Sequence, residues 1–273
     1  MVREITIGQY YHADSVIHKL DPRVKLMGTL IYVIGLFVVN NALGYLVVAI
    51  TLGTVIGLSK VPIKFMVRGL KAVMIVLLLT VSLNLFLTPG IQVVHFWIFT
   101  ITMEGIKASA YMAIRLVLLI MGCSVMTLTT TPNHLTDGLE KGLKFLEVFR
   151  IPVHEIAMMM SIALRFIPIL LEETDKIMKA QAARCADFES GGIIKRAKSM
   201  VPILVPLFVS AFRRANDLAM AMEARCYRGG KGRTKMKPLK YTGRDYAGYI
   251  LMAVFMAITI FVAIYGTLPF ENF

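Results

Sequence analysis

The chain has 273 residues, of which 57% are hydrophobic and 17% charged, and its mean hydropathy is +0.69. Soluble globular domains are about half apolar and about a quarter charged, so these values exclude an ordinary soluble protein and predict one solvated mostly by lipid. The formal net charge of +13 is typical of nucleic-acid binding, of contact with an anionic membrane surface, or of the positive-inside bias of membrane proteins.

Long stretches without charged residues predict five membrane-spanning helices, each of which needs roughly 20 apolar residues. The first stretch, residues 26–59, is long enough for two short spans, and the turn-forming Asn40-Asn41 pair predicts a tight hairpin between them. The second stretch is broken at Pro89-Gly90, after which residues 95–97 predict an aromatic-rich loop at the membrane interface. The other spans are expected at about residues 70–88, 110–131 and 246–270.

The positions of Lys and Arg predict the orientation of these spans, because the cytoplasmic loops of membrane proteins carry the excess of positive charge. We expect a multi-pass protein of the cell membrane with its N-terminus in the cytoplasm and, after five spans, its C-terminus outside. The residues that decide this precede the first span or separate the second from the third: Arg3, Lys19, Arg23, Lys25, Lys60, Lys64, Arg68 and Lys71.

The segment between the fourth and fifth spans holds two thirds of the chain's Lys and Arg and falls on the predicted cytoplasmic side. Its position explains the basic charge without a nucleic-acid partner. The expected fold is therefore an all-α integral membrane protein in three parts. The parts are residues 1–131 with four spans, residues 132–244 as a cytoplasmic and membrane-surface module, and residues 245–273 as the last span.

Hydrophobic periodicity predicts three helices in this module. The first is short and amphipathic, and the two that follow are long, start apolar and finish charged, so each is expected to lie along or dip into the membrane surface before projecting into the cytosol. Pro168 is expected to bend the first long helix. The expected helices cover about residues 134–148, 152–187 and 193–227.

The two long helices end in the same triplet, Ala183-Arg184-Cys185 and Ala224-Arg225-Cys226. One interpretation is structural, because alanine favours helix and an arginine near a helix C-terminus interacts with the macrodipole by about 0.3–1 kcal/mol. The other is that each end is a plug, in which small residues allow close approach and the arginine offers a fork of donors to a carboxylate or to carbonyls of a partner. Two similar plugs suit two similar partners, or one partner dimer with pseudo-twofold symmetry.

No other pattern predicts a catalytic, cofactor-binding or metal site. Residues 229–234 do not match a phosphate-binding G-x-x-x-x-G-K-[ST] loop, and their glycines are expected to cap the preceding helix. His154-Glu155 does not continue to an H-E-x-x-H zinc motif, and Cys123, Cys185 and Cys226 form no C-x-x-C pair. We therefore expect a protein that is not an enzyme and needs no cofactor.

Two features have more than one interpretation. Arg115, expected near the start of the fourth span, is either a functional intramembrane charge or a side chain that reaches the interface along its helix. The methionines of the long helices either fill gaps in packing or form an adaptable surface that repacks against different partners. The residues in question are Met158, Met159, Met160 and Met200.

Together these motifs resemble the T component of energy-coupling factor transporters, the EcfT family, over nearly the whole chain, and the N-terminal run resembles the group II type that several substrate-binding subunits share. In one respect the chain departs from the family, because Cys185 and Cys226 stand where glycine is usual. Cysteine is small enough for close approach but disfavours a left-handed backbone. The residues that carry the resemblance are 7–10, 14–15, 20–26, 183–188 and 221–230.

The resemblance implies a subunit without catalytic residues that links two ABC ATPases, EcfA and EcfA′, to interchangeable S components, the membrane proteins that bind vitamins or other micronutrients. The three-helix module would be its coupling domain. Residues 183–185 and 224–226 would dock into the ATPases, with Arg184 and Arg225 as the coupling residues. We also expect the methionine-rich faces at Met158–Met160 and Met200 to contact the S component.

Three alternatives stay open. Within the family, the chain could be a dedicated T component for a single S component, as in cobalt or biotin systems of the CbiQ and BioN type. Outside it, a conventional ABC permease would need polar or charged residues lining its spans, which hold almost none. A membrane anchor or lipid-binding protein would carry diffuse Lys-rich charge for anionic headgroups, rather than two matched helix ends.

Overall fold

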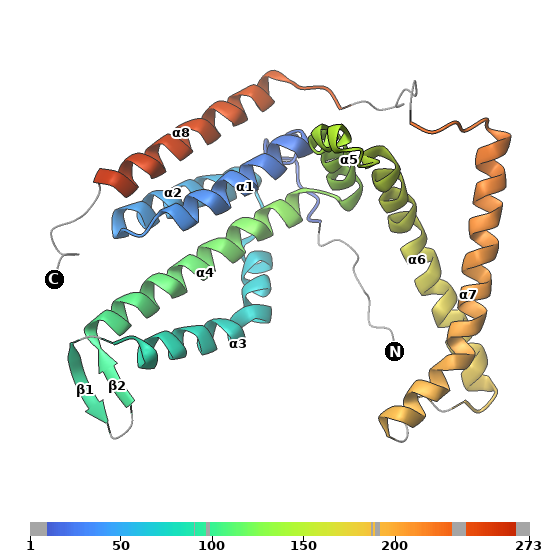
Figure 1. Cartoon of the computed structure of the whole chain (residues 1–273), viewed down its shortest axis with the longest axis horizontal. Helices are drawn as coiled ribbons and strands as arrows, with labels where there is room; N and C mark the ends of the chain where they lie inside the picture. The colour runs from blue at the N-terminus through green and yellow to red at the C-terminus, as the bar shows by residue number, and fades with distance from the viewer. Residues whose placement is uncertain are drawn as a thin grey trace. The chain divides into compact units, whose positions relative to one another are not determined.

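The computed structural model describes residues 10–89, 91–96, 99–186, 188, 192–230 and 239–265, and most of these residues are helical (Figure 1). The first part of the expected opening motif, residues 7–9, lies outside this range, as do Asp187, residues 231–238 and the end of the last expected span. The helices and strands are α1 (Pro22–Val38), α2 (Ala42–Ser59), α3 (Ile63–Leu87), β1 (Gln92–Phe96), β2 (Phe99–Thr102), α4 (Met103–Thr129), α5 (Pro132–Gly142), the 3-10 helix η1 (Lys144–Phe149), α6 (Val153–Ala183), α7 (Ile193–Ala224) and α8 (Gly243–Tyr265).

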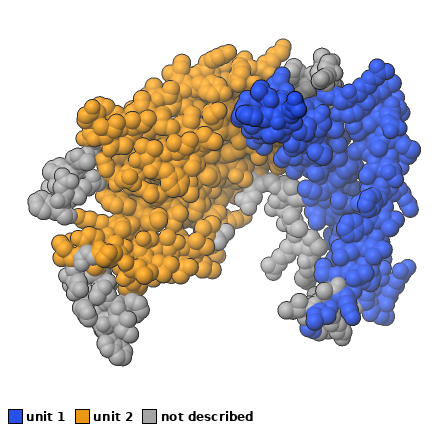
Figure 2. Space-filling view, in the orientation of Figure 1, with its two compact units in different colours: residues 1–7, 139–238 blue, residues 8–138, 239–273 orange. Residues whose placement is uncertain are grey.

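The chain divides into two compact units (Figure 2). One contains the described residues of 8–138 together with those of 239–273, and therefore α1 to α4 and α8. The other contains the described residues of 139–238, and therefore α6 and α7.

The fold class expected from the sequence is confirmed. Four described helices, α2, α4, α6 and α8, are long and apolar enough to cross a membrane, and α3 makes a fifth if its two halves, which meet at a bend of 62°, form one span. The helix α1, expected as the first span, has 17 residues and is about 26 Å long at 1.5 Å per residue. The helix α6, expected along the membrane surface, is itself apolar enough to cross it.

A short antiparallel hairpin connects α3 to α4, where the sequence predicted an interfacial loop. Phe96 pairs with Phe99 and Gln92 with Thr102 across it. The prediction missed these strands because it relied on aromatic content, which is common to interfacial loops and to strands.

The core of the unit that contains residues 8–138 and 239–273 (orange in Figure 2) lies between α1, α2, α4 and α8. The Tyr32 ring packs so closely on Gly122 that a Cβ there would lie 2.3 Å from a ring carbon, and the Tyr32 hydroxyl donates to the Leu118 carbonyl at 2.9 Å. Glycine at such a crossing lets the two helix backbones approach. Many large apolar side chains point outward instead, among them Ile75 at 82% exposure, as expected for helices that face lipid.

A polar cluster at the start of α1 fastens this helix to α8. The Asp21 carboxylate caps α1 by accepting from the Arg23 backbone N–H at 2.9 Å, and it forms an ion pair with the Arg23 guanidinium at 2.8 Å. The guanidinium also stacks on the Tyr241 ring at 3.8 Å. Asp245, in the first turn of α8, accepts a hydrogen bond from the backbone N–H of Asp21 at 2.8 Å.

The cluster stabilises the ionised form of Asp21. Its burial raises the pKa, but the hydrogen bonds and charge of Arg23 outweigh the burial, so that the pKa lies below its ordinary value. A lowered carboxyl pKa means that the cluster stabilises the fold above the ordinary pKa of Asp and loses this contribution as the pH falls through the lower, folded value.

Two further cations tie α4 to the rest of its unit. The Lys25 ammonium donates to the carbonyl of Thr129, the last residue of α4, at 2.9 Å. Arg115 is the thirteenth residue of the 27-residue helix α4. It donates to the Tyr45 hydroxyl at 2.9 Å and to the Asn40 side chain at 2.8 Å, and so binds the hairpin between α1 and α2.

The cluster at Asp21 generates a stability prediction. Replacing Asp245 by Ala removes the acceptor of the buried Asp21 N–H, and an unsatisfied buried donor costs about 1–3 kcal/mol. We expect the variant to lose its monodisperse elution at a clearly lower temperature than the unchanged protein. The measurement is fluorescence-detected size exclusion after heating in detergent. The control is Asp14→Ala, because Asp14 is 94% exposed and its ion pair with Lys19 contributes about 0–1 kcal/mol. Equal midpoints for the two variants would contradict the assignment.

Candidate functional site

The end of α6 is closed by two backbone hydrogen bonds of the Schellman type. Ala183 is the last helical residue and Arg184 follows as the cap, with φ −91°. Cys185 then adopts a left-handed backbone with φ 63°. Its N–H donates to the Ala182 carbonyl at 3.0 Å, and the Ala186 N–H donates to the Gln181 carbonyl at 3.1 Å.

The end of α7 repeats this geometry residue for residue. Arg225 is the cap with φ −89°, and Cys226 is left-handed with φ 54°. The Cys226 N–H donates to the Glu223 carbonyl at 2.8 Å, and the Tyr227 N–H donates to the Met222 carbonyl at 3.1 Å. The triplets that the sequence singled out are therefore two copies of one three-dimensional motif.

The left-handed cysteines correct one expectation from the sequence. Cysteine at these positions argued against a left-handed backbone, yet both residues adopt it. For an L-residue other than glycine this conformation costs roughly 1–2 kcal/mol, and the two hydrogen bonds of each cap offset the cost. The helix ends thus keep the backbone that glycine usually provides, with a thiol side chain in addition.

The arginines of both motifs are exposed and make no ion pair or side-chain hydrogen bond with any part of the chain that the structure describes. Arg23 and Arg214, in contrast, are bound to carboxylates. The other residues of the two triplets are exposed as well: Ala183, Cys185, Ala224 and Cys226. Each helix end therefore presents a guanidinium whose donors are available to a partner.

The helices α6 and α7 run antiparallel and are held by a polar contact that the sequence did not predict. The Glu173 carboxylate accepts a hydrogen bond from Ser210 and forms an ion pair with Arg214 at 2.8 Å. Spacing along α6 alone favours pairs of Glu173 with residues of its own helix and does not reveal the neighbouring helix. Beside this contact lies an apolar groove lined by Ile162, Phe166, Leu170, Ala211, Arg214, Ala215, Leu218, Ala219 and Met222.

The contact at Glu173 also determines how far apart the two motifs lie. Arg184 follows Glu173 by eleven residues and Arg225 follows Arg214 by eleven residues, which is about 16 Å along each helix. Because the helices are antiparallel (Figure 1), the two arginines extend in opposite directions from the contact. A single small binding groove cannot hold both ends.

Much of the surface of α6 and α7 is apolar and exposed. The predicted methionines belong to it: Met159, Met160 and Met200 are 58%, 42% and 53% exposed, and Met158 is half-buried. On α7 the sequence reasoning missed an aromatic and aliphatic stripe. Its spacing of four and three residues, which marks one helix face, was the available signal. The stripe consists of Val201, Val205, Phe208 and Phe212, with Leu204 and Val209 beside it.

The glycines after α7 do not cap it, because Cys226 already does. Gly229 has φ 87°, and Gly230 packs on the ring of His154 so tightly that a Cβ would lie 2.3 Å from a ring carbon. The His154 ring is held on its other side by Glu140 at 2.9 Å. Among the described residues no group of three or more His, Cys, Asp or Glu side chains could hold a metal ion.

Comparison with known proteins gives a consistent result. Residues 13–236 match the CbiQ family, described as cobalt transport protein. The chain is 54% identical over 262 residues to the energy-coupling factor transporter transmembrane protein EcfT of Clostridium kluyveri, covering 95% of this chain and 97% of the relative. It is 52% identical to the EcfT of Thermosediminibacter oceani, over 96% of this chain and 100% of the relative, and 44% identical to that of Bacillus subtilis, over 96% and 99%.

The left-handed caps generate a prediction about local stability. Replacing Cys185 or Cys226 by Gly relieves the strain of a left-handed residue, so we expect the amide of Ala186 or Tyr227 to exchange about two- to fivefold more slowly, which corresponds to about 0.4–1 kcal/mol. Replacement by the β-branched Val should accelerate exchange. Hydrogen exchange resolved at these amides is the measurement. Cys123→Val, in the interior of α4, is the control and should leave both caps unchanged. Slower exchange with Val than with Gly would contradict the cap assignment.

Proposed function

Because the chain belongs to the CbiQ family and is an EcfT-type transmembrane component of energy-coupling factor transporters, we propose that it transmits ATP-driven movements of two ABC ATPases to a substrate-binding S component. ATP hydrolysis belongs to the ATPases in this proposal, and the chain itself is a mechanical link without catalytic residues. Its N-terminus and the module of α5, α6 and α7 face the cytoplasm, where the ATPases are.

The observation that carries the proposal is the pair of identical helix ends. Each presents one exposed arginine beside small residues, Ala183 and Cys185 or Ala224 and Cys226. A guanidinium offers a rigid fork of donors that suits a carboxylate or backbone carbonyls in a groove. Since the ends extend in opposite directions from Glu173, each one engages its own ATPase, EcfA or EcfA′, and the antiparallel pair spans both.

The apolar face of α6 and α7 is the proposed contact with the S component. It combines Met159, Met160 and Met200 with the stripe around Phe208 and Phe212 on α7. Methionine has no branched carbon and three rotatable bonds, so such a face can repack against S components of different shape. This property favours the shared type, with several vitamins or other micronutrients as substrates, over a dedicated T component with one S component.

A conventional permease receives less support. The groove between α3 and α4 and the groove between α6 and α7 are lined mostly by apolar side chains. Arg115, the charge inside the fourth span, is engaged by Tyr45 and Asn40 rather than facing an open path. Neither these two grooves nor Arg115 supports a polar translocation pathway through this chain alone.

Charge reversal at the helix ends tests the coupling role. Removing an arginine that is desolvated in a partner's pocket weakens binding by about 2 kcal/mol or more, which is about 30-fold in affinity. Arg184→Glu and Arg225→Glu should therefore each reduce the amount of ATPase that co-purifies with the tagged chain. Each should also reduce vitamin uptake. Arg213→Glu, an equal change at an exposed position within α7, should alter neither. Full complex and uptake in the Arg184→Glu/Arg225→Glu double variant would rule out the assignment.

Replacement of the methionines tests the S-component surface. We expect Met159→Val/Met160→Val/Met200→Val to preserve ATPase co-purification but to impair uptake of some vitamins more than others, because branched side chains adapt poorly to partners of different shape. Uptake of several labelled vitamins in cells that contain the corresponding S components is the measurement. Unchanged uptake of all of them would contradict the proposal, and co-purification of one S component alone would favour the dedicated type.

A further inference from the structure

The first part of α3 is a short helix with one basic face. A bend of 62° separates residues Ile63–Lys71 from Val73–Leu87. Within the first part, Lys64, Arg68 and Lys71 follow one another at intervals of four and three residues, which places them on the same side of the helix. All three side chains are exposed, and we call this set the basic face.

Among the described residues, no carboxylate is paired with the basic face. The sequence contains no Asp or Glu between residues 22 and 103. None of the ion pairs between described residues involves Lys64, Arg68 or Lys71. The positive-inside bias explains why cations occur in this region, but it does not require them to share one face of a helix.

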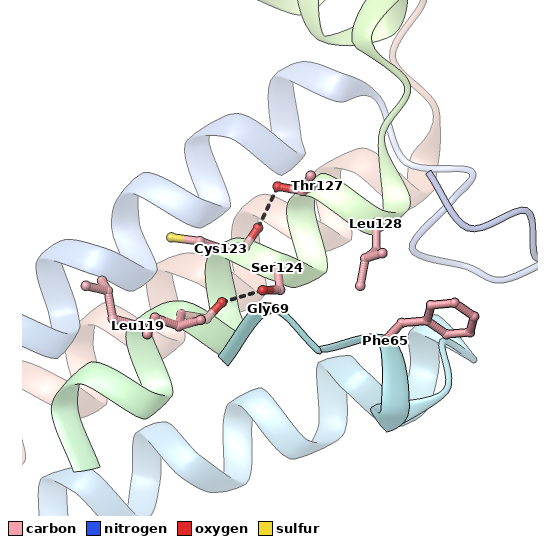
Figure 3. A pocket seen from close by; sticks show the side chains of 8 residues that line it. Phe65, Gly69, Leu119, Cys123, Ser124, Thr127 and Leu128 are labelled. Carbon is pink, nitrogen blue, oxygen red and sulfur yellow. Dashed lines mark hydrogen bonds between the residues drawn. The ribbon is translucent and has the colours of Figure 1, made fainter. Parts of the chain in front are cut away.

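An apolar groove, whose lining is shown in Figure 3, begins one residue along α3 from the basic face. Phe65 and Gly69 of α3 line one side, one residue beyond Lys64 and Arg68, and thus about 100° around the helix. The other side is formed by α4, and the groove has a volume of about 310 Å³. The residues from α4 are Leu119, Ile120, Cys123, Ser124, Thr127 and Leu128.

The two hydroxyls in the groove are already used within α4. Ser124 donates to the Ile120 carbonyl at 2.7 Å and Thr127 donates to the Cys123 carbonyl at 3.1 Å, as the dashed lines of Figure 3 mark. Their donors are therefore not directed at an occupant, and the groove presents mainly hydrocarbon. Such a lining suits an acyl chain better than a polar ligand.

One contact joins the basic face to the groove. The Arg68 guanidinium lies over the Phe65 ring at 5.6 Å, and Phe65 is itself part of the groove lining. A group held by Arg68 is consequently positioned at the mouth of the groove. Guanidinium and ammonium groups together are well suited to a phosphate, which accepts bidentate hydrogen bonds from Arg and point-charge contacts from Lys.

We propose that this place binds one anionic phospholipid, with its phosphate headgroup on Lys64, Arg68 and Lys71 and one acyl chain in the groove between α3 and α4. The argument for a lipid is the charge complementarity of the basic face combined with an apolar groove at its edge, in a chain that crosses a membrane. Basic pockets beside membrane-spanning helices select anionic headgroups in this way.

The test uses the full-length chain in mild detergent, titrated with phosphatidylglycerol or phosphatidylcholine of identical acyl chains, with bound lipid counted by native mass spectrometry. We expect one phosphatidylglycerol to bind at least tenfold more tightly than phosphatidylcholine. Lys64→Gln/Arg68→Gln/Lys71→Gln should remove this preference. The control, Lys176→Gln/Lys179→Gln/Arg213→Gln, removes the same charge from exposed positions on α6 and α7 and should retain it.

A second arm locates the acyl chain. Phosphatidylglycerol that carries a photoreactive diazirine in one acyl chain should cross-link to the peptide containing residues 119–128, and Cys123→Phe, which fills the groove, should abolish this adduct. Arg68→Lys keeps the charge but loses the forked donors of the guanidinium, and should weaken phosphatidylglycerol binding about threefold. This single substitution keeps the test available if the triple variant does not fold.

Three results would overturn the proposal. The first is equal binding of the two lipids, and the second is an unchanged preference in the triple variant. The third is an adduct outside residues 119–128. None of these measurements depends on ATPase docking or uptake, so the proposal stands or fails independently of the coupling role.

Discussion

The contact of Glu173 with Ser210 and Arg214 sets the geometry of the α6–α7 pair. It joins two long helices at one point, and their antiparallel direction then sends the arginine-bearing ends away from each other. An ion pair with Arg at partial exposure contributes little to stability by itself. Its importance here is positional, because a shift of one helical turn along either helix would move an arginine by about 5 Å.

The other unit is organised around the start of α1. Within five residues, Asp21, Arg23 and Lys25 reach α8, the segment before it and the end of α4. This segment was recognised in the sequence as part of a family motif, but without a physical role. The structure supplies one: it gathers helix ends that are more than a hundred residues apart and satisfies their backbone groups with charged side chains, which is how helix termini are stabilised where apolar packing stops.

Sequence patterns predicted the elements well and their contacts poorly. Charge-free stretches located α1 to α4 and α8 because membrane spans need long apolar runs, and the repeated Ala-Arg-Cys triplet located both helix ends. The left-handed backbone of Cys185 and Cys226 contradicted the conformational preference of cysteine. The two hydrogen bonds of each cap, rather than this preference, determine the backbone conformation there. The partners of Glu173 and Arg115 were missed for a related reason. These partners lie 37 or more residues away, and no periodicity within one helix encodes a neighbour on another.

The cysteines that replace glycine in the two caps have a practical consequence. Each exposed thiol immediately follows Arg184 or Arg225 in the chain, so any partner that encloses the arginine also encloses the sulfur. Each end of the α6–α7 pair therefore carries a natural site for chemical labelling. In native membranes, the rate of alkylation at each thiol would report how long that end is uncovered, separately for the two ends and without any engineered label.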